Sequence, residues 1–87
     1  MEKRIGTVLL LIDHREEIDK LNLILGDHQQ LIIARQGIPL HNRRYNLISL
    51  IIEGSTDEIG SLTGKLGRLE GIYVKSAVIN KKLENRP

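Results

Sequence analysis

The chain has 87 residues, the length of one domain, and its apolar residues are nearly all aliphatic: thirteen Ile and fourteen Leu against two Tyr, with no Phe or Trp. The net charge is +2, with much of the excess in the C-terminal residues Lys81, Lys82 and Arg86. The lack of cysteine excludes disulfides, thiolate metal sites and cysteine catalysis.

The first predicted element is a strand from Ile5 to Ile12, a short and mostly apolar run. The run ends at Asp13 without a small-residue cleavage site, so it indicates a buried strand rather than a secretory signal. We therefore expect a soluble, cytoplasmic protein with no membrane partner, since the sequence also lacks the ~20 apolar residues that a span needs. Asp13 is expected to cap the next helix, with Glu16 as its reciprocal partner.

That helix is predicted from residues at helical spacing, the apolar Ile18, Leu21, Ile24 and Leu25 followed by His28. A second strand is predicted from Leu31 to Gln36, and Gly37, Ile38 and Pro39 are expected to end it. The polar loop that follows, from Pro39 to Arg44, is either an anion-binding loop that uses its arginines or a solvated hairpin loop.

A third strand is predicted from Tyr45 to Glu53, and a last one from Ile72 to Ile79. Between them, Ser55 and Glu58 are expected to form a capping box at the start of a second helix. An apolar stripe at helical spacing predicts the face of this helix that packs on a sheet, with members Ile59, Leu62, Leu66 and Leu69.

Three glycines, Gly60, Gly64 and Gly67, lie on the other side of this second helix. Each glycine costs about 1 kcal/mol relative to alanine in a helix interior. We therefore predict that something approaches the helix backbone closely at these positions. The candidates are the neighbouring helix, a partner subunit or a small ligand.

The predicted order β-α-β-β-α-β, with right-handed crossovers, indicates an α+β ferredoxin-like sandwich: a four-stranded antiparallel sheet with two helices on one face. The first and third strands are expected at the centre because they are apolar on both faces, whereas the other two carry charges that suit a sheet edge. Two helices cover only one sheet face, so the other apolar face would be exposed in a monomer. This predicts a homodimer or homotetramer.

No motif in the sequence demands catalysis, so we expect a protein that is not an enzyme. His14, His28 and His41 lack the i, i+4 spacing of paired helical ligands, which leaves them as surface or capping residues or as parts of a metal site assembled across subunits. Nucleic-acid binding is not expected, since the basic tail is accompanied neither by a broad basic face nor by stacking aromatics.

The stretch SLTGKLGRLEGIYVKSA at Ser61 to Ala77, with RQGIP at Arg35 to Pro39, resembles the iron-only hydrogenase system regulator family. These are small stand-alone ACT-like proteins, similar to the C-terminal domain of nickel-responsive regulators. The resemblance implies a regulatory or sensing role, with one ACT-like domain over residues 1–80 and a polar tail over residues 81–87. The sequence departs from nickel-responsive regulators in lacking a ribbon-helix-helix segment and the Cys and His-x-His nickel ligands.

ACT-like dimers often bind effectors at subunit interfaces near the first βα turn and the helices. The resemblance thus implies a ligand-binding site made by Asp13, His14 and Arg15 with Gly60, Gly64 and Gly67, although the usual glycine-containing turn is missing. It implies no particular cofactor or metal. The leading hypothesis is a homo-oligomeric regulatory domain that binds a small effector or a protein partner. The alternatives are a nickel- or iron-sensing protein that uses His14, His28 or His41, and a nucleic-acid-binding transcriptional regulator.

Overall fold

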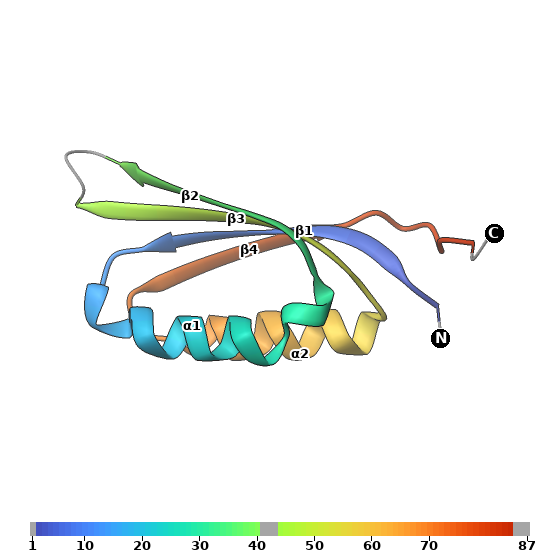
Figure 1. The fold of residues 1–87 in the computed structure, drawn as a ribbon, viewed down its shortest axis with the longest axis horizontal. Helices are drawn as coiled ribbons and strands as arrows, with labels where there is room; N and C mark the ends of the chain where they lie inside the picture. The colour runs from blue at the N-terminus through green and yellow to red at the C-terminus, as the bar shows by residue number, and fades with distance from the viewer. Residues whose placement is uncertain (1, 41–43, 85–87) are drawn as a thin grey trace.

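The computed structural model describes residues 2–40 and 44–84. Its main elements are β1 (Arg4–Ile12), α1 (Ile18–Asp27), β2 (Ile32–Leu40), β3 (Tyr45–Gly54), α2 (Thr56–Gly67) and β4 (Ile72–Val78), with 3₁₀ turns at Arg15–Glu17 and Gln29–Leu31. The strands form one antiparallel sheet in the order β2-β3-β1-β4, and both helices lie on the same face of it (Figure 1). The predicted ferredoxin-like fold is confirmed.

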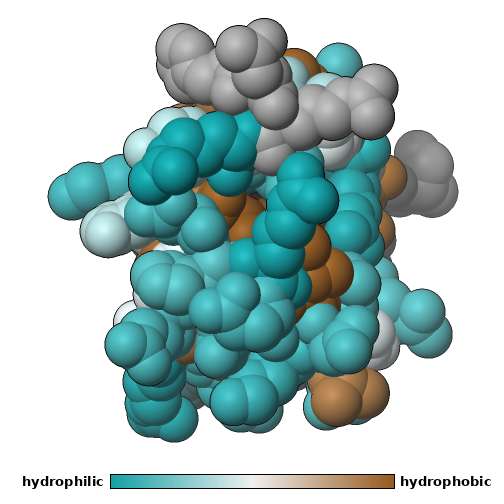
Figure 2. Space-filling view, turned by 90° about the vertical axis from the view of Figure 1, so that its left-hand side faces the viewer, coloured by the Kyte–Doolittle hydropathy of each residue, from teal (hydrophilic) through white to brown (hydrophobic). Residues whose placement is uncertain are grey.

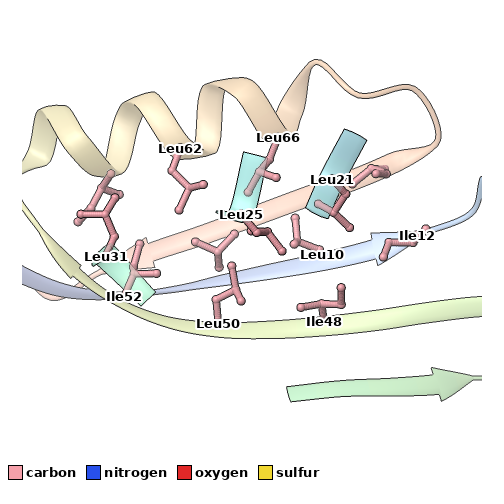
Figure 3. Packing of buried hydrophobic residues seen from close by; sticks show 13 residues of the cluster. Leu10, Ile12, Leu21, Leu25, Leu31, Ile48, Leu50, Ile52, Leu62 and Leu66 are labelled. Carbon is pink, nitrogen blue, oxygen red and sulfur yellow. The ribbon is translucent and has the colours of Figure 1, made fainter. Parts of the chain in front are cut away.

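The hydrophobic core lies between the two central strands and the helices (Figure 3). Successive side chains of a strand point to opposite faces, so alternate residues of β1 and β3 face the helices. These residues are buried, and their partners come from the apolar stripes of α1 and α2. The principal members are Val8, Leu10, Ile12, Ile48, Leu50 and Ile52 from the sheet, and Leu21, Leu25, Ile59, Leu62 and Leu66 from the helices.

The predicted capping box of Asp13 and Glu16 is wrong. The chain enters a 3₁₀ turn at Arg15 and then α1 at Ile18, and neither N-cap residue accepts a side-chain capping bond. The backbone N–H of Asp13 donates to the carbonyl oxygen of Gly71 at 2.8 Å, so it is not available to the side chain of Glu16 as the reciprocal capping bond requires. The helical segments also begin later in the chain, with His14 and Glu17 at the N-cap positions.

The predicted end of the second strand is also wrong, because β2 continues through Gly37 and Pro39 to Leu40. Pro39 lies opposite Asn46 of β3. Since β2 is an edge strand, a proline that lacks an N–H can be accommodated on the side without a neighbour. The expected basic loop falls largely on residues 41–43, which lie outside the described residues.

The start of α2 agrees with the sequence. The Oγ atom of Ser55 accepts a hydrogen bond from the backbone N–H of Glu58 at 3.1 Å, and the backbone N–H of Ser55 donates to Oε1 of Glu58 at 2.9 Å. The helix ends at Gly67, earlier than the apolar stripe suggests, although Leu69 still packs against the core.

The described residues contain no helix that is long and apolar enough to cross a membrane. Beyond β4, the backbone N–H of Ile79 donates to the carbonyl oxygen of Ile5, and that of Leu83 donates to Lys3, both at 2.9 Å. Residues 81–84, the described part of the predicted tail, therefore run beside the N-terminal segment.

Replacing the fully buried Leu50 by alanine should lower the free energy of unfolding by about 2–5 kcal/mol, because it leaves a cavity in the middle of the core. Leu23→Ala is the matched control: Leu23 is 69% exposed, and its truncation should change stability by less than about 0.5 kcal/mol. Chemical denaturation of the two variants measures both values. Equal losses would contradict the described core.

The capping box predicts an acid-dependent loss of stability. Hydrogen bonds from the backbone and side chain of Ser55 hold the pKa of Glu58 below its ordinary value of 4.5. A carboxyl group whose pKa is lower in the folded than in the unfolded state stabilises the protein at any pH above its unfolded-state pKa. This stabilisation is lost as the pH falls through the pKa of the folded state. The free energy of unfolding, measured by denaturation at a series of pH values between pH 6 and about pH 2, should therefore fall more steeply for the wild type than for Glu58→Gln. Parallel curves would contradict the prediction.

Candidate functional site

The three residues predicted to form a site at the first βα turn face three different parts of the molecule. Asp13 lies close enough to Arg44 to contribute, after Tyr45, to raising the pKa of that guanidinium above its ordinary range. The Arg44 guanidinium lies over the Tyr45 ring, 5.2 Å from its centre. Since Ile12 pairs with Asn46, Asp13 follows β1 beside the start of β3.

His14 packs against the turn that precedes β4. Gly71 adopts φ = 72°, a conformation that favours glycine, and a Cβ atom at that position would overlap the His14 ring. The buried Nδ1 atom of His14 has no hydrogen-bond partner among the described residues. Glycine at position 71 therefore provides both the backbone conformation and the space that the imidazole occupies.

Arg15 lines a groove on the helix-facing side of the sheet, which we call the Arg15–Arg35 groove. It lies between α1 and the β2–β3 hairpin and has a volume of about 440 Å³. Its polar lining residues are Arg15, Asn22, Arg35 and Asn46, and its apolar ones include Ile12, Ile18, Leu21 and Ile48. Figure 2, which faces the hairpin end of the molecule, shows hydrophobic surface enclosed by hydrophilic side chains.

Sequence reasoning missed most of this groove. From the sequence, Arg35 is a charge that suits an edge strand and part of the RQGIP stretch, but nothing there pairs it with α1, where its Nη2 atom donates a hydrogen bond to Oδ1 of Asn22 at 3.1 Å. The useful signal was the pair Arg35 and Gly37 in one apolar strand, because alternate residues of a strand share a face.

The glycine side of α2 is open. A Cβ atom built at Gly60, Gly64 or Gly67 would meet no described atom within 4 Å beyond the helix backbone and the adjacent residues. The neighbouring helix therefore does not explain these glycines. Gly60 lines a hollow with Val78, and Gly67 lines another with Tyr73, so this side of the helix flanks the outer edge of β4. These two hollows differ from the groove that Arg15 lines, and ligand binding at Asp13, His14, Arg15 and the three glycines stays a prediction.

The sheet face opposite the helices, which we call the open sheet face, exposes large apolar side chains. The strand register places Ile38, Leu47, Leu11 and Tyr73 in one row across the sheet. Ile38 and Tyr73 are exposed, and Leu47 and Leu11 are half-buried. Leu9 lies in the next row and Ile51 in the row after it, and they are 44% and 40% exposed. Polar residues, including Ser49 and Lys75, lie among them.

The histidines do not converge on a metal site within the described residues, where no group of three His, Cys, Asp or Glu side chains could hold an ion. His28 is 8% exposed, and its Nδ1 atom lies 2.9 Å from the carbonyl oxygen of Ile24. A carbonyl can only accept, so Nδ1 carries the proton and His28 stabilises the end of α1. His41 lies outside the described residues.

Comparison with known proteins gives one family. The profile described as "TM1266-like: Iron-only hydrogenase system regulator, putative" matches residues 4–76. No curated protein matches the chain.

Among solved structures, the uncharacterized protein TM1266 from Thermotoga maritima is similar to this chain, with 29% identity, a TM-score of 0.85, and coverage of 91% of this chain and 100% of that one. The de novo designed protein Foldit4 has 10% identity and a TM-score of 0.56, covering 92% and 99% of the two chains. At that identity the likeness shows the fold alone. The divalent ion tolerance protein CutA1 from Ehrlichia chaffeensis has 10% identity, coverage of 91% and 84%, and a TM-score of 0.48.

The contact between His14 and Gly71 predicts a coupled pair of mutations. Gly71→Ala should lower the free energy of unfolding by about 2–4 kcal/mol, since it adds the cost of a left-handed backbone to a clash with the imidazole. Adding His14→Ala should relieve the clash and restore that part of the lost stability, while the cost of the left-handed backbone remains. A double-mutant cycle measures the resulting non-additivity.

Gly26→Ala on α1 is the control for this pair. A Cβ atom there meets open space, so the substitution should stabilise the protein by about 0.5–1 kcal/mol. Strict additivity of Gly71→Ala and His14→Ala would show that the two residues do not touch.

Proposed function

This chain belongs to the TM1266-like family of iron-only hydrogenase system regulators, and on that premise we propose that it is a homo-oligomeric regulatory domain that senses a small effector. The regulated system that the family description names is the iron-only hydrogenase system. The protein would act there by binding and assembly rather than by catalysis.

The observation that carries this proposal is the open sheet face. Both helices lie on the opposite side of the sheet, so neither covers the apolar row of Ile38, Leu47, Leu11 and Tyr73, in which Ile38 and Tyr73 are exposed and the other two are half-buried. Soluble monomers rarely expose contiguous apolar patches of more than a few hundred Å². A partner that removes this face from water would gain the hydrophobic free energy that the monomer forgoes.

A second copy of the chain is the occupant that fits this face. The face is a sheet, and two sheets pack face to face at about 10 Å with their side chains interdigitated. Under two-fold symmetry an identical copy presents the same apolar row, so the contact is self-complementary. Further copies could add at other surfaces, including the open glycine side of α2 beside the β4 edge.

The effector-binding part of the proposal rests on the Arg15–Arg35 groove. Its volume of about 440 Å³ lies in the range of small-molecule sites, and it combines apolar walls with a few polar groups. Arg15 belongs to both this groove and the site implied by family resemblance. The metal-sensing and nucleic-acid-binding alternatives gain no specific support from the described residues.

A charged residue in the open sheet face should prevent assembly. Leu9→Glu places a carboxylate in the apolar surface, where pairing of two copies would bury two like charges. We expect native mass spectrometry to show oligomers for the wild type and monomers for this variant.

Leu23→Glu is the matched control, because Leu23 is an exposed leucine on α1, away from the open sheet face. This variant should assemble as the wild type does. A monomeric wild type, or an assembled Leu9→Glu variant, would overturn the proposed interface.

A further inference from the structure

The Arg15–Arg35 groove exists because α1 does not cover the edge strand β2. Nearly the whole of β2 is exposed, whereas the residues that β1 and β3 direct to the helices are buried. The groove therefore has an apolar wall of core residues such as Ile12, Ile18 and Ile48, reached from the side of β2. A ligand there would lie against the margin of the core without entering it.

The charged side chains that line the groove are all positive. Two arginines line it, from the turn before α1 and from β2, and no Asp or Glu side chain is among its lining residues. Within the described residues Arg35 has no carboxylate partner, and its hydrogen bond to the neutral Asn22 leaves guanidinium N–H groups for another acceptor. Asn22 and Asn46 add amide groups at the same place.

The floor of the groove is bare at Gly37. This residue lies opposite Ile48, so a side chain at position 37 would point to the same face of the sheet as Ile48 does. A Cβ atom built there meets no described atom within 4 Å. Because Gly37 has no side chain, the space between β2, which carries Arg35, and the turn before α1, which carries Arg15, stays open.

From these features we propose that the Arg15–Arg35 groove binds a small amphipathic carboxylate, with its anionic head on the arginine side and its apolar body on the aliphatic wall. A planar guanidinium matches a carboxylate with two parallel hydrogen bonds. The aliphatic wall accounts for the apolar body, which a simple inorganic anion lacks. This inference deepens the proposed effector-sensing function by naming the chemistry of the effector.

The test uses the full ¹⁵N-labelled chain and amide chemical shifts. Phenylacetate and hexanoate are the probes, phenylacetamide is the neutral counterpart, and inorganic phosphate is the anion without an apolar body. We expect both carboxylates to cause saturable shifts at backbone amides around the groove, including Asn22, Gly37 and Asn46. The amide and phosphate should bind about tenfold more weakly or not at all.

Two variants locate the site. Arg35→Gln removes the charge from β2 and should weaken carboxylate binding about tenfold or more. Gly37→Val fills the floor and should abolish binding, while its valine suits a strand whose glycine has no left-handed conformation. Arg68→Gln is the matched control: it removes the same charge at the C-terminal end of α2, outside the groove, and should leave binding unchanged.

Several outcomes would overturn the inference: no saturable shifts with either carboxylate, equal binding of phenylacetamide or phosphate, or unchanged binding by Arg35→Gln. If Gly37→Val does not fold, the comparison of Arg35→Gln with Arg68→Gln decides. Native mass spectrometry of the same samples separates this inference from the proposed function. Assembly without carboxylate binding contradicts the groove alone, and binding without assembly contradicts the oligomer alone.

Discussion

Two helices can cover only one face of a four-stranded sheet, and both central strands of this chain are apolar on both faces. On β1, Val8 and Leu10 are fully buried beneath the helices, while Leu9 between them is 44% exposed. The remaining surfaces follow from this mismatch. The open sheet face has apolar residues without cover, and the uncovered edge strand β2 leaves the margin of the core accessible as a groove.

The two surfaces lie on opposite sides of the same hairpin. In β2, Arg35 and Gly37 line the groove. Ile38 and Leu47 also border it, and the register pairs these two residues in the apolar row of the open sheet face. A ligand in the groove and a second copy on the open sheet face would thus contact the same two strands.

Much of the fold could be predicted from the sequence because its signals are local or periodic. The nearly continuous apolar runs of β1 and β3, the apolar stripes of the two helices and the Ser55–Glu58 capping box all depend on residues within a few positions of one another. The errors arose where a distant segment decides. The N–H of Asp13 is bound to Gly71 and so is not available to Glu16, and Pro39 stays in β2 because this strand pairs with β3 on one side and lies at the sheet edge on the other.

By itself, the sequence determined the order of the elements, the two central strands and the excess of apolar surface, since hydrophobic periodicity and strand character are properties of short segments. Only the tertiary structure decided what the functional candidates face. Asp13, His14 and Arg15 are consecutive, yet Asp13 lies beside the start of β3, His14 packs against Gly71, and Arg15 lines the groove. Arg15 and Arg35, twenty positions apart, line the same groove. The direction of each side chain is set by the strand or turn that packs against it, and that neighbour is remote in the sequence.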